Sequence, residues 1–158
     1  MKKRFLLAVA VFSLTSFCFA QKISKNAIGL RIGDNNGIGT EISYQRGLKK
    51  NRLEIDLGWR DTKSYDAFKL TGLYQWVWNL DKGFNWYAGV GGGIGSYDFH
   101  KGYDYDDESF AFAAGDLGIE YNFDIPLLIS LDFRPELGFN DYGDDLDFDI
   151  AFGIRYQF

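Results

Sequence analysis

Apolar residues alternate with small or polar residues along almost the whole chain, and this pattern restricts the fold more than any other feature. The alternation starts near Asn26, continues to Phe158, and is interrupted at fairly even intervals by clusters of turn-forming residues. A period of two places successive side chains on opposite faces of a strand, so the pattern predicts β-strands. We predict eight strands, near residues 26–33, 38–46, 52–60, 67–79, 84–97, 109–122, 127–139 and 145–158.

The sixth predicted strand is the least regular. Phe110 and Phe112 are out of phase with the apolar positions Leu117 and Ile119, which suggests a β-bulge between the two pairs. No helical segment, linker or second domain is visible between the strands. The body of the chain also lacks the apolar run of roughly 20 residues that a transmembrane helix needs. With 46% hydrophobic and 18% aromatic residues, the chain is too apolar to be disordered, so one ordered all-β domain is predicted.

The first twenty residues have the pattern of a secretory signal peptide. Basic residues at positions 2–4 precede an apolar run at 5–19, and Ala20 offers a small residue for cleavage. We therefore predict a cleaved signal peptide at residues 1–20 and an exported domain at residues 21–158.

Charge and cysteine content narrow the classes of partner. Cys18 is the single cysteine and lies in the predicted signal peptide, so the exported domain would have neither disulfides nor thiol chemistry. Without its basic leader, the chain is more acidic than its overall formal charge of −5. Such an acidic protein is a poor partner for nucleic acid.

The alternation fits two architectures: a soluble barrel or sandwich with its apolar face inward, and a membrane barrel with its apolar face outward. The non-apolar face favours the second. It contains the column Gly89, Gly91, Gly93 and Gly95, and a narrow lumen needs such a column because missing side chains leave room for large ones from other strands. The same face contains fourteen charged residues: Arg31, Glu41, Glu54, Asp56, Arg60, Lys69, Asp116, Glu120, Asp132, Arg134, Glu136, Asp147, Asp149 and Arg155.

The strand ends and connections also favour a membrane barrel. The connections near residues 47–51, 80–83 and 123–126 are short and the one at 98–108 is long, which matches short periplasmic turns and longer outer loops, although the connection at 34–37 is a short exception. Large aromatic residues collect at strand ends, as interfacial girdles require. One predicted rim contains Tyr44, Tyr74, Trp76, Trp78, Trp86, Tyr121, Tyr156 and Phe158, and the other contains Trp59, Phe68, Phe139 and Phe148.

The end of the chain carries a family resemblance. Residues 152–158 read Phe-Gly-Ile-Arg-Tyr-Gln-Phe, in which apolar and aromatic residues alternate up to a terminal Phe. This ending resembles the signal by which bacterial outer-membrane barrels are recognised by their assembly machinery, with Phe152, Ile154, Tyr156 and Phe158 at the signal positions. Together with the signal peptide and the segment at 129–136, it resembles the small eight-stranded outer-membrane proteins of the OmpA-barrel, OmpX and OmpW kind.

The resemblance implies an eight-stranded antiparallel up-and-down β-barrel that spans the outer membrane. It also implies the lipid bilayer and lipopolysaccharide as surroundings, and periplasmic chaperones and the barrel-assembly complex as partners during biogenesis. Roles in these proteins range from membrane integrity to adhesion. The resemblance implies no cofactor.

The main role of the charged side chains on the inner face is to fill the barrel, because the interior of an eight-stranded barrel is just wide enough for side chains. Unpaired buried charges are costly, so these residues must form ion pairs. Acids outnumber bases, so some carboxylates must lie near the mouths, bind water or a cation, or be protonated. A polar plug is the main interpretation, and a narrow ion-conducting path is the alternative. The predicted network comprises Arg31, Glu41, Glu54, Asp56, Arg60, Lys69, Asp116, Glu120, Asp132, Arg134, Glu136 and Arg155.

The connection at 98–108 is the most distinctive one. Its carboxylates could hold a divalent cation, but they lack the EF-hand spacing, and a solvated acidic loop is the simpler interpretation. Tyr103 and Tyr105 could instead form an adhesive tip for an extracellular protein partner.

Catalysis is the least supported interpretation. His100 is the only histidine, with Ser96, Asp98 and Ser109 nearby in sequence. These residues lie around a loop without evident oxyanion donors, so we expect no enzyme activity. The sequence therefore predicts a structural or interacting outer-membrane barrel, and a soluble exported barrel that binds an apolar ligand inside is the competing hypothesis.

Overall fold

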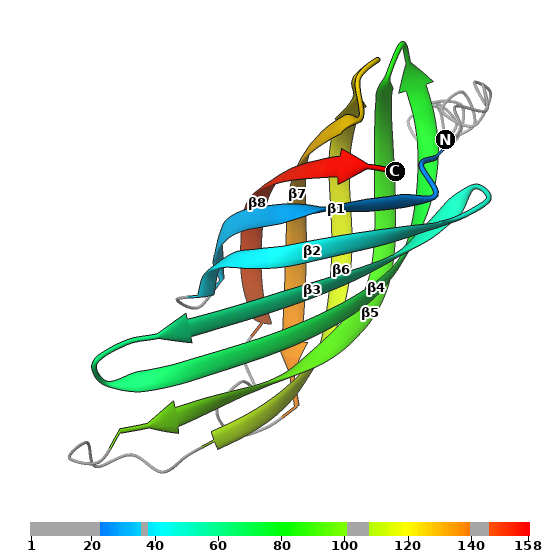
Figure 1. Cartoon of the computed structure of the whole chain (residues 1–158). Coiled ribbons are helices and arrows are strands. Elements are labelled where there is room, and N and C mark those ends of the chain that lie inside the picture. Colours follow the sequence, from blue (N-terminus) through cyan, green and yellow to red (C-terminus); the bar gives the residue numbers. More distant parts are fainter. Residues whose placement is uncertain (1–22, 36–37, 101–107, 140–145) are drawn as a thin grey trace, which may run out of the picture.

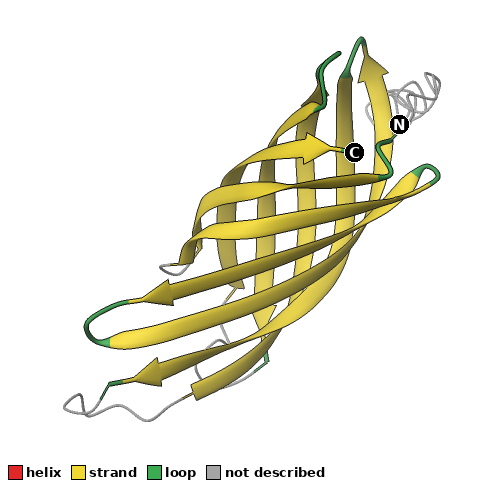
Figure 2. Ribbon diagram, in the orientation of Figure 1, coloured by secondary structure: helices red, strands yellow, loops and turns green. Residues whose placement is uncertain are grey.

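The chain forms one closed antiparallel barrel in which each strand pairs with its neighbours in sequence (Figures 1 and 2). The computed structural model describes residues 23–35, 38–100, 108–139 and 146–158. All eight predicted strands are present; the first six extend further than predicted, and the last two are slightly shorter. The strands are β1 (Asn26–Asn35), β2 (Ile38–Leu48), β3 (Asn51–Asp61), β4 (Tyr65–Asp81), β5 (Phe84–Phe99), β6 (Glu108–Asn122), β7 (Leu127–Gly138) and β8 (Leu146–Gln157).

The first and last strands close the barrel. β1 pairs with β8 from Ala27 opposite Gln157 to Gly33 opposite Ala151. At the end of this seam, the Asn26 N–H donates to the Phe158 carbonyl at 3.0 Å, and the Phe158 N–H donates back at 2.9 Å. We call the end of the barrel that contains Asn26 and Phe158 the proximal end, and the opposite end the distal end. Within the described ranges, the chain has no helix long and apolar enough to cross a membrane.

Two of the proximal connections are two-residue hairpin turns. β2 leads to β3 through Lys49 and Lys50, and β4 leads to β5 through Lys82 and Gly83. Lys82 and Gly83 both have positive φ, at 37° and 96°, as a type I′ turn requires. These tight turns fix the register of the strand pairs that follow.

The side chains sort by face with few exceptions. Most large apolar residues point outward, as on β8, where Phe148, Ile150 and Phe152 are 55%, 63% and 46% exposed. The intervening residues point inward, and the buried ones are mostly polar or charged. An apolar coat around a polar interior is the reverse of a soluble barrel.

β6 differs from the prediction of a bulge. It pairs with β5 without interruption from Tyr121 opposite Phe84 to Glu108 opposite Tyr97. Phe110 and Phe112 therefore lie on the inward face, where Phe112 is 5% exposed and packs against Leu73 and Ala114. The phase of the sequence pattern was correct, and the error was the assumption that large apolar residues must face outward.

The glycine column of β5 explains how the barrel accommodates these rings. A Cβ at Gly93 would lie 2.5 Å from the Phe112 ring, and a Cβ at Gly95 would lie 2.3 Å from the Phe110 ring. At Gly91, a Cβ would meet the carbonyl oxygen of Gly72 at 1.9 Å. The column therefore serves both the aromatic side chains from β6 and the close approach of the β4 backbone.

Four strands project beyond the others at the distal end (Figure 1). β2 stops pairing with β3 at Gly58, whereas β3 pairs with β4 as far as Asp61 opposite Asp66. β4 pairs with β5 as far as Tyr65 opposite Phe99, while β6 and β7 begin to pair only at Phe112. We call the resulting four-stranded projection of β3 to β6 the distal extension.

Candidate functional site

The barrel interior contains most of the sequence-predicted charges. Eleven of the twelve predicted residues are at most 6% exposed: Arg31, Glu41, Glu54, Asp56, Lys69, Asp116, Glu120, Asp132, Arg134, Glu136 and Arg155.

The prediction was wrong for Arg60, which does not belong to the interior. It is exposed on the distal extension, past the last β2 partner of β3, so the opposite wall of the barrel does not cover it.

Two further buried charges belong to the interior. Asp149 is 1% exposed; the alternation placed it on the inner face, but it was not part of the predicted network. Arg52, also 1% exposed, was missed altogether. Its position was readable, because Arg52 lies two and four residues before Glu54 and Asp56 and therefore shares their face. The described interior thus buries eight carboxylates and five basic groups.

Arg31 organises the first group of ion pairs. From β1, its Nη1 contacts Glu41 Oε2 of β2 at 2.9 Å and Asp149 Oδ2 of β8 at 2.6 Å. Its Nε and Nη2 donate to Asp132 Oδ1 of β7 at 2.9 and 2.5 Å. One guanidinium therefore joins three carboxylates from three strands, a geometry that the fork of five donors on an arginine permits.

Glu54 organises the second group. Its Oε1 lies 3.3 Å from both Arg134 Nη2 and Arg155 Nη2, and its Oε2 accepts a 2.5 Å hydrogen bond from Gln45. Arg134 Nη2 also contacts Asp56 Oδ2 at 2.7 Å.

Arg155 also binds two hydroxyl groups. Its Nε donates to Ser43 Oγ at 2.9 Å, and its Nη1 donates to Ser130 Oγ at 2.8 Å. The group around Glu54 and Arg155 thus connects opposite walls of the barrel.

Two cation–carboxylate pairs lie against aromatic rings. Near the proximal end, Arg52 Nη1 contacts Glu120 Oε2 at 2.6 Å, and the guanidinium lies 4.5 Å from the ring centre of Tyr87. Further toward the distal end, Lys69 Nζ contacts Glu136 Oε2 at 2.6 Å and lies 4.6 Å from the ring centre of Phe112.

Asp116 is the exception among the buried carboxylates of the described chain. It is 5% exposed and accepts a hydrogen bond from Gln75 Nε2, but no described basic group lies within ion-pair distance of it.

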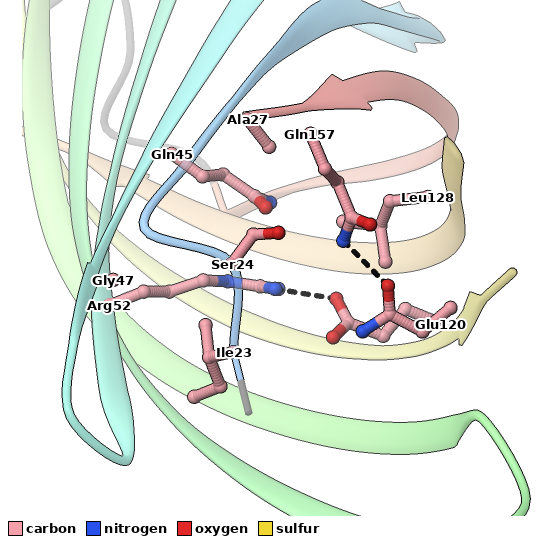
Figure 3. Close-up of a pocket in the computed structure, with 10 residues that line it drawn as sticks. Ile23, Ser24, Ala27, Gln45, Gly47, Arg52, Glu120, Leu128 and Gln157 are labelled. Carbon is pink, nitrogen blue, oxygen red and sulfur yellow. Dashed lines mark hydrogen bonds and ion pairs between the residues drawn. The ribbon is translucent and has the colours of Figure 1, made fainter. Parts of the chain in front are cut away.

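The proximal mouth is covered by the start of the described chain. Figure 3 shows Ile23 and Ser24 beside Arg52, Glu120 and Gln157. The segment is held by a 3.0 Å hydrogen bond from the Gly47 N–H to the Lys25 carbonyl. The cavity behind it measures about 10 Å³, roughly the space for one water molecule. The interior is therefore filled by side chains here.

The outer surface carries the predicted aromatic rims. At the proximal end, Trp78 stacks on Trp86 at 4.3 Å between ring centres. At the distal end, Phe148 stacks on Phe133 at 5.5 Å. The four residues of the predicted C-terminal signal all point outward from β8 or follow it, with exposed fractions of 41–60%: Phe152, Ile154, Tyr156 and Phe158.

His100 follows β5 on the distal extension, and both of its ring nitrogens have partners. Nε2 lies 3.3 Å from Asp66 Oδ2, and Nδ1 lies 3.2 Å from the Lys63 carbonyl oxygen. Hydrogen bonding to Asp66 and to this carbonyl raises the pKa of His100 above 6.5. The residues at 101–107, including Tyr103 and Tyr105, lie outside the described residues.

Comparisons with known proteins connect this geometry to a class of fold. No family model matches the chain, and no curated protein matches it in sequence. Among solved structures, it is similar to the N-terminal β-barrel domain of Pseudomonas aeruginosa OprF, at a TM-score of 0.69 and 12% identity over 87% of this chain and 100% of that one.

Two further structures show the same likeness. Neisserial surface protein A has a TM-score of 0.60 at 9% identity over 84% of this chain and 94% of that one. The attachment invasion locus protein Ail of Yersinia pestis has a TM-score of 0.58 at 15% identity over 87% and 99%. At these identities the likeness establishes the fold alone: an all-β, closed, eight-stranded antiparallel barrel of the kind found in small outer-membrane proteins and in designed transmembrane barrels.

Proposed function

We propose that this protein is an integral outer-membrane β-barrel with a structural or surface-interaction role. The observation that carries the proposal is the arrangement of its two faces. Leu, Ile, Val and aromatic side chains cover the outside of the barrel, while arginines and carboxylates fill the inside in ion pairs. So large an apolar surface is costly in water and suits the hydrocarbon of a bilayer.

The route to the membrane is part of the same proposal. Residues 1–20 act as a signal peptide cleaved after Ala20, and residues 21–158 form the barrel domain. Phe152, Ile154, Tyr156 and Phe158 present the signal read by the barrel-assembly machinery after delivery by periplasmic chaperones. Their outward side chains support this role, because a recognition signal must be accessible before insertion.

The interior acts as a plug rather than as a ligand cavity. Five buried bases paired with carboxylates leave little room for an apolar ligand, which argues against the soluble ligand-binding alternative. A narrow pore remains the competing function of the interior. Planar-bilayer recordings of the purified barrel should show no stepwise conductance, and regular single-channel steps would favour the pore.

The surface role involves the distal end. The distal extension and the connection at 98–108 offer contact area to an extracellular protein, and outer-leaflet lipopolysaccharide surrounds the wall. Two of the structurally similar proteins are described as a surface protein and an attachment invasion locus protein, which supports this direction. The role is non-catalytic, because the ring nitrogens of His100 contact Asp66 and a backbone carbonyl instead of a serine nucleophile.

Cell fractionation with gel electrophoresis tests the proposal. Outer-membrane fractions should contain the protein as a band whose mobility differs between unboiled and boiled samples, because a closed barrel resists unfolding by detergent. A soluble periplasmic band with no heat-dependent shift would contradict it. N-terminal sequencing of the membrane form should begin at Gln21.

A further inference from the structure

The described chain begins at the proximal mouth of the barrel, three residues before β1 starts at Asn26. We call residues 23–25 the strap. Asn26 fixes the end of the strap to the barrel wall, because its N–H donates to the Phe158 carbonyl at 3.0 Å and its Oδ1 accepts a hydrogen bond from Arg46 at 2.7 Å. The strap itself leaves the wall and runs across the mouth, next to side chains that point inward from other strands (Figure 3).

Gly47 allows the wall of the barrel to approach the strap closely. It occupies an inward position near the end of β2, and its N–H donates to the Lys25 carbonyl at 3.0 Å. A Cβ at this position would lie 2.4 Å from the Ser24 carbonyl oxygen and 3.4 Å from Ile23 Cγ2. A larger residue at position 47 would therefore displace the strap, because the nearest atom belongs to the backbone and cannot rotate away.

The ion pair behind the strap is buried although it lies near the ends of its strands. Arg52 is the second residue of β3 and is 1% exposed, and its partner Glu120, near the end of β6, is 3% exposed. Arg60, on an inward position at the other end of β3, is exposed. The two ends of β3 differ in that the strap lies beside Arg52, with a cavity of only about 10 Å³ between them.

We propose that the strap is the closure of the proximal mouth, and that displacing it opens the interior to water as far as the Arg52–Glu120 pair. Its place in the chain suits this role. The mature chain of the proposed function begins at Gln21, so the strap has a free end, and β1 starts to pair only at Asn26. The strap can therefore leave the mouth while the pairing of β1 remains intact. This freedom rests on the proposed removal of the signal peptide.

Thiol accessibility tests the proposal, because the mature chain would contain no cysteine of its own. Ala27→Cys places a thiol behind the strap, since Ala27 is 2% exposed and lines the same cavity. The mature barrel is refolded in detergent micelles, which leave both mouths open to solvent, and the rate of labelling by a charged methanethiosulfonate reagent is measured by mass spectrometry. Labelling should be slow, because the reagent enters only while the strap is displaced. A rate equal to that of the urea-unfolded protein would overturn the proposal.

Gly47→Val displaces the strap in the same background. The labelling rate of Ala27→Cys should then rise by about tenfold or more, because the displaced state becomes the main one. Gly39→Val is the matched control: Gly39 lies on the same face of β2, and a Cβ there would meet only the Gly33 carbonyl oxygen, at 3.5 Å. Equal labelling rates in the two double variants would contradict the proposal.

A mature chain that begins at Lys25 removes most of the strap without changing Gly47. It keeps the test informative if Gly47→Val fails to fold, which the heat-dependent gel shift would reveal. Its Ala27→Cys form should be labelled as fast as the form with Gly47→Val, and slow labelling would show that something other than the strap closes the mouth.

Ala151→Cys is the control for position along the barrel. Ala151 is 1% exposed and lies on the same β1–β8 seam, but opposite Gly33, toward the distal end. Its labelling rate should be the same with and without the strap, and a matching rise there would mean that the whole barrel had loosened, against the proposal. The result is separable from the fractionation experiment: a barrel in the outer membrane whose labelling ignores the strap refutes this inference alone, whereas a soluble location refutes the proposed function.

Discussion

At the scale of single residues, Arg31 shows why the interior depends on pairing. Its guanidinium is 1% exposed and contacts Glu41, Asp132 and Asp149. Arg31→Met preserves much of the side-chain volume but leaves three buried carboxylates without this partner. We expect it to lower the free energy of unfolding by about 3–5 kcal/mol, measured by urea titration of the barrel in lipid vesicles.

Arg60→Met is the control for this prediction. Arg60 is also an arginine on an inward position of its strand, but it is exposed on the distal extension. Its replacement should change the unfolding free energy by less than about 1 kcal/mol. Equal effects of the two substitutions would show that burial of the Arg31 network does not govern stability.

A second prediction at this scale concerns His100. Hydrogen bonding to Asp66 raises the pKa of His100 above 6.5, so the charged pair stabilises the extension fully below pH 6.5 and is lost as the pH rises through the folded-state pKa. The chain has a single histidine, so its imidazole resonances can be followed by NMR. In Asp66→Asn, the titration midpoint should move down toward 6.5, and an unchanged midpoint would contradict the pairing.

At the scale of elements, the glycines of β4 and β5 divide into two kinds. A Cβ at Gly93 would lie 2.2 Å from the Leu70 carbonyl oxygen and 2.5 Å from the Phe112 ring, whereas a Cβ at Gly72 would have no heavy atom within 4 Å. Gly93→Ala should destabilise the barrel by about 1–3 kcal/mol through overpacking. Gly72→Ala should change stability by no more than about 0.5 kcal/mol. Urea unfolding of the two variants side by side tests this. Similar losses of stability in both would contradict the packing role of the glycine column.

The strands also show which structural features the sequence pattern could predict and which it could not. All eight strands and their inward and outward faces could be predicted, because lipid outside and packing inside impose a strict period of two. Phe110 and Phe112 could not be placed from polarity alone. Their inward position depends on Gly93 and Gly95 on the neighbouring strand, and this pairing is fixed only by the register.

At the scale of the whole molecule, Phe158 takes part in closing the barrel and also belongs to the proposed assembly signal. Its backbone exchanges two hydrogen bonds with Asn26 at the β1–β8 seam, while its side chain is 60% exposed. Phe158→Ala keeps the backbone bonds and removes the ring. Because the proposed assembly signal includes this ring, we expect Phe158→Ala to lower the amount of protein assembled in the outer membrane by several-fold, measured by quantitative immunoblotting.

Refolding into lipid vesicles without that machinery should be unchanged in Phe158→Ala. Phe139→Ala is the control, since Phe139 is comparably exposed, at 65%, but lies at the distal end. If refolding in vesicles were impaired as strongly as assembly in cells, the ring would act on stability rather than on recognition.

The sequence by itself determined the strand number, the all-β class, the inner and outer faces and most of the interior charges, since a two-residue period records the environment of each face locally. Tertiary structure alone decided which charges meet. Arg31 joins residues from three other strands up to 118 positions away, a relation absent from any local pattern. It also excluded Arg60 from the interior, because β3 extends past its last β2 partner there and the opposite wall does not cover the side chain. The length of neighbouring strands, and hence the distal extension, follows from pairing across the sheet.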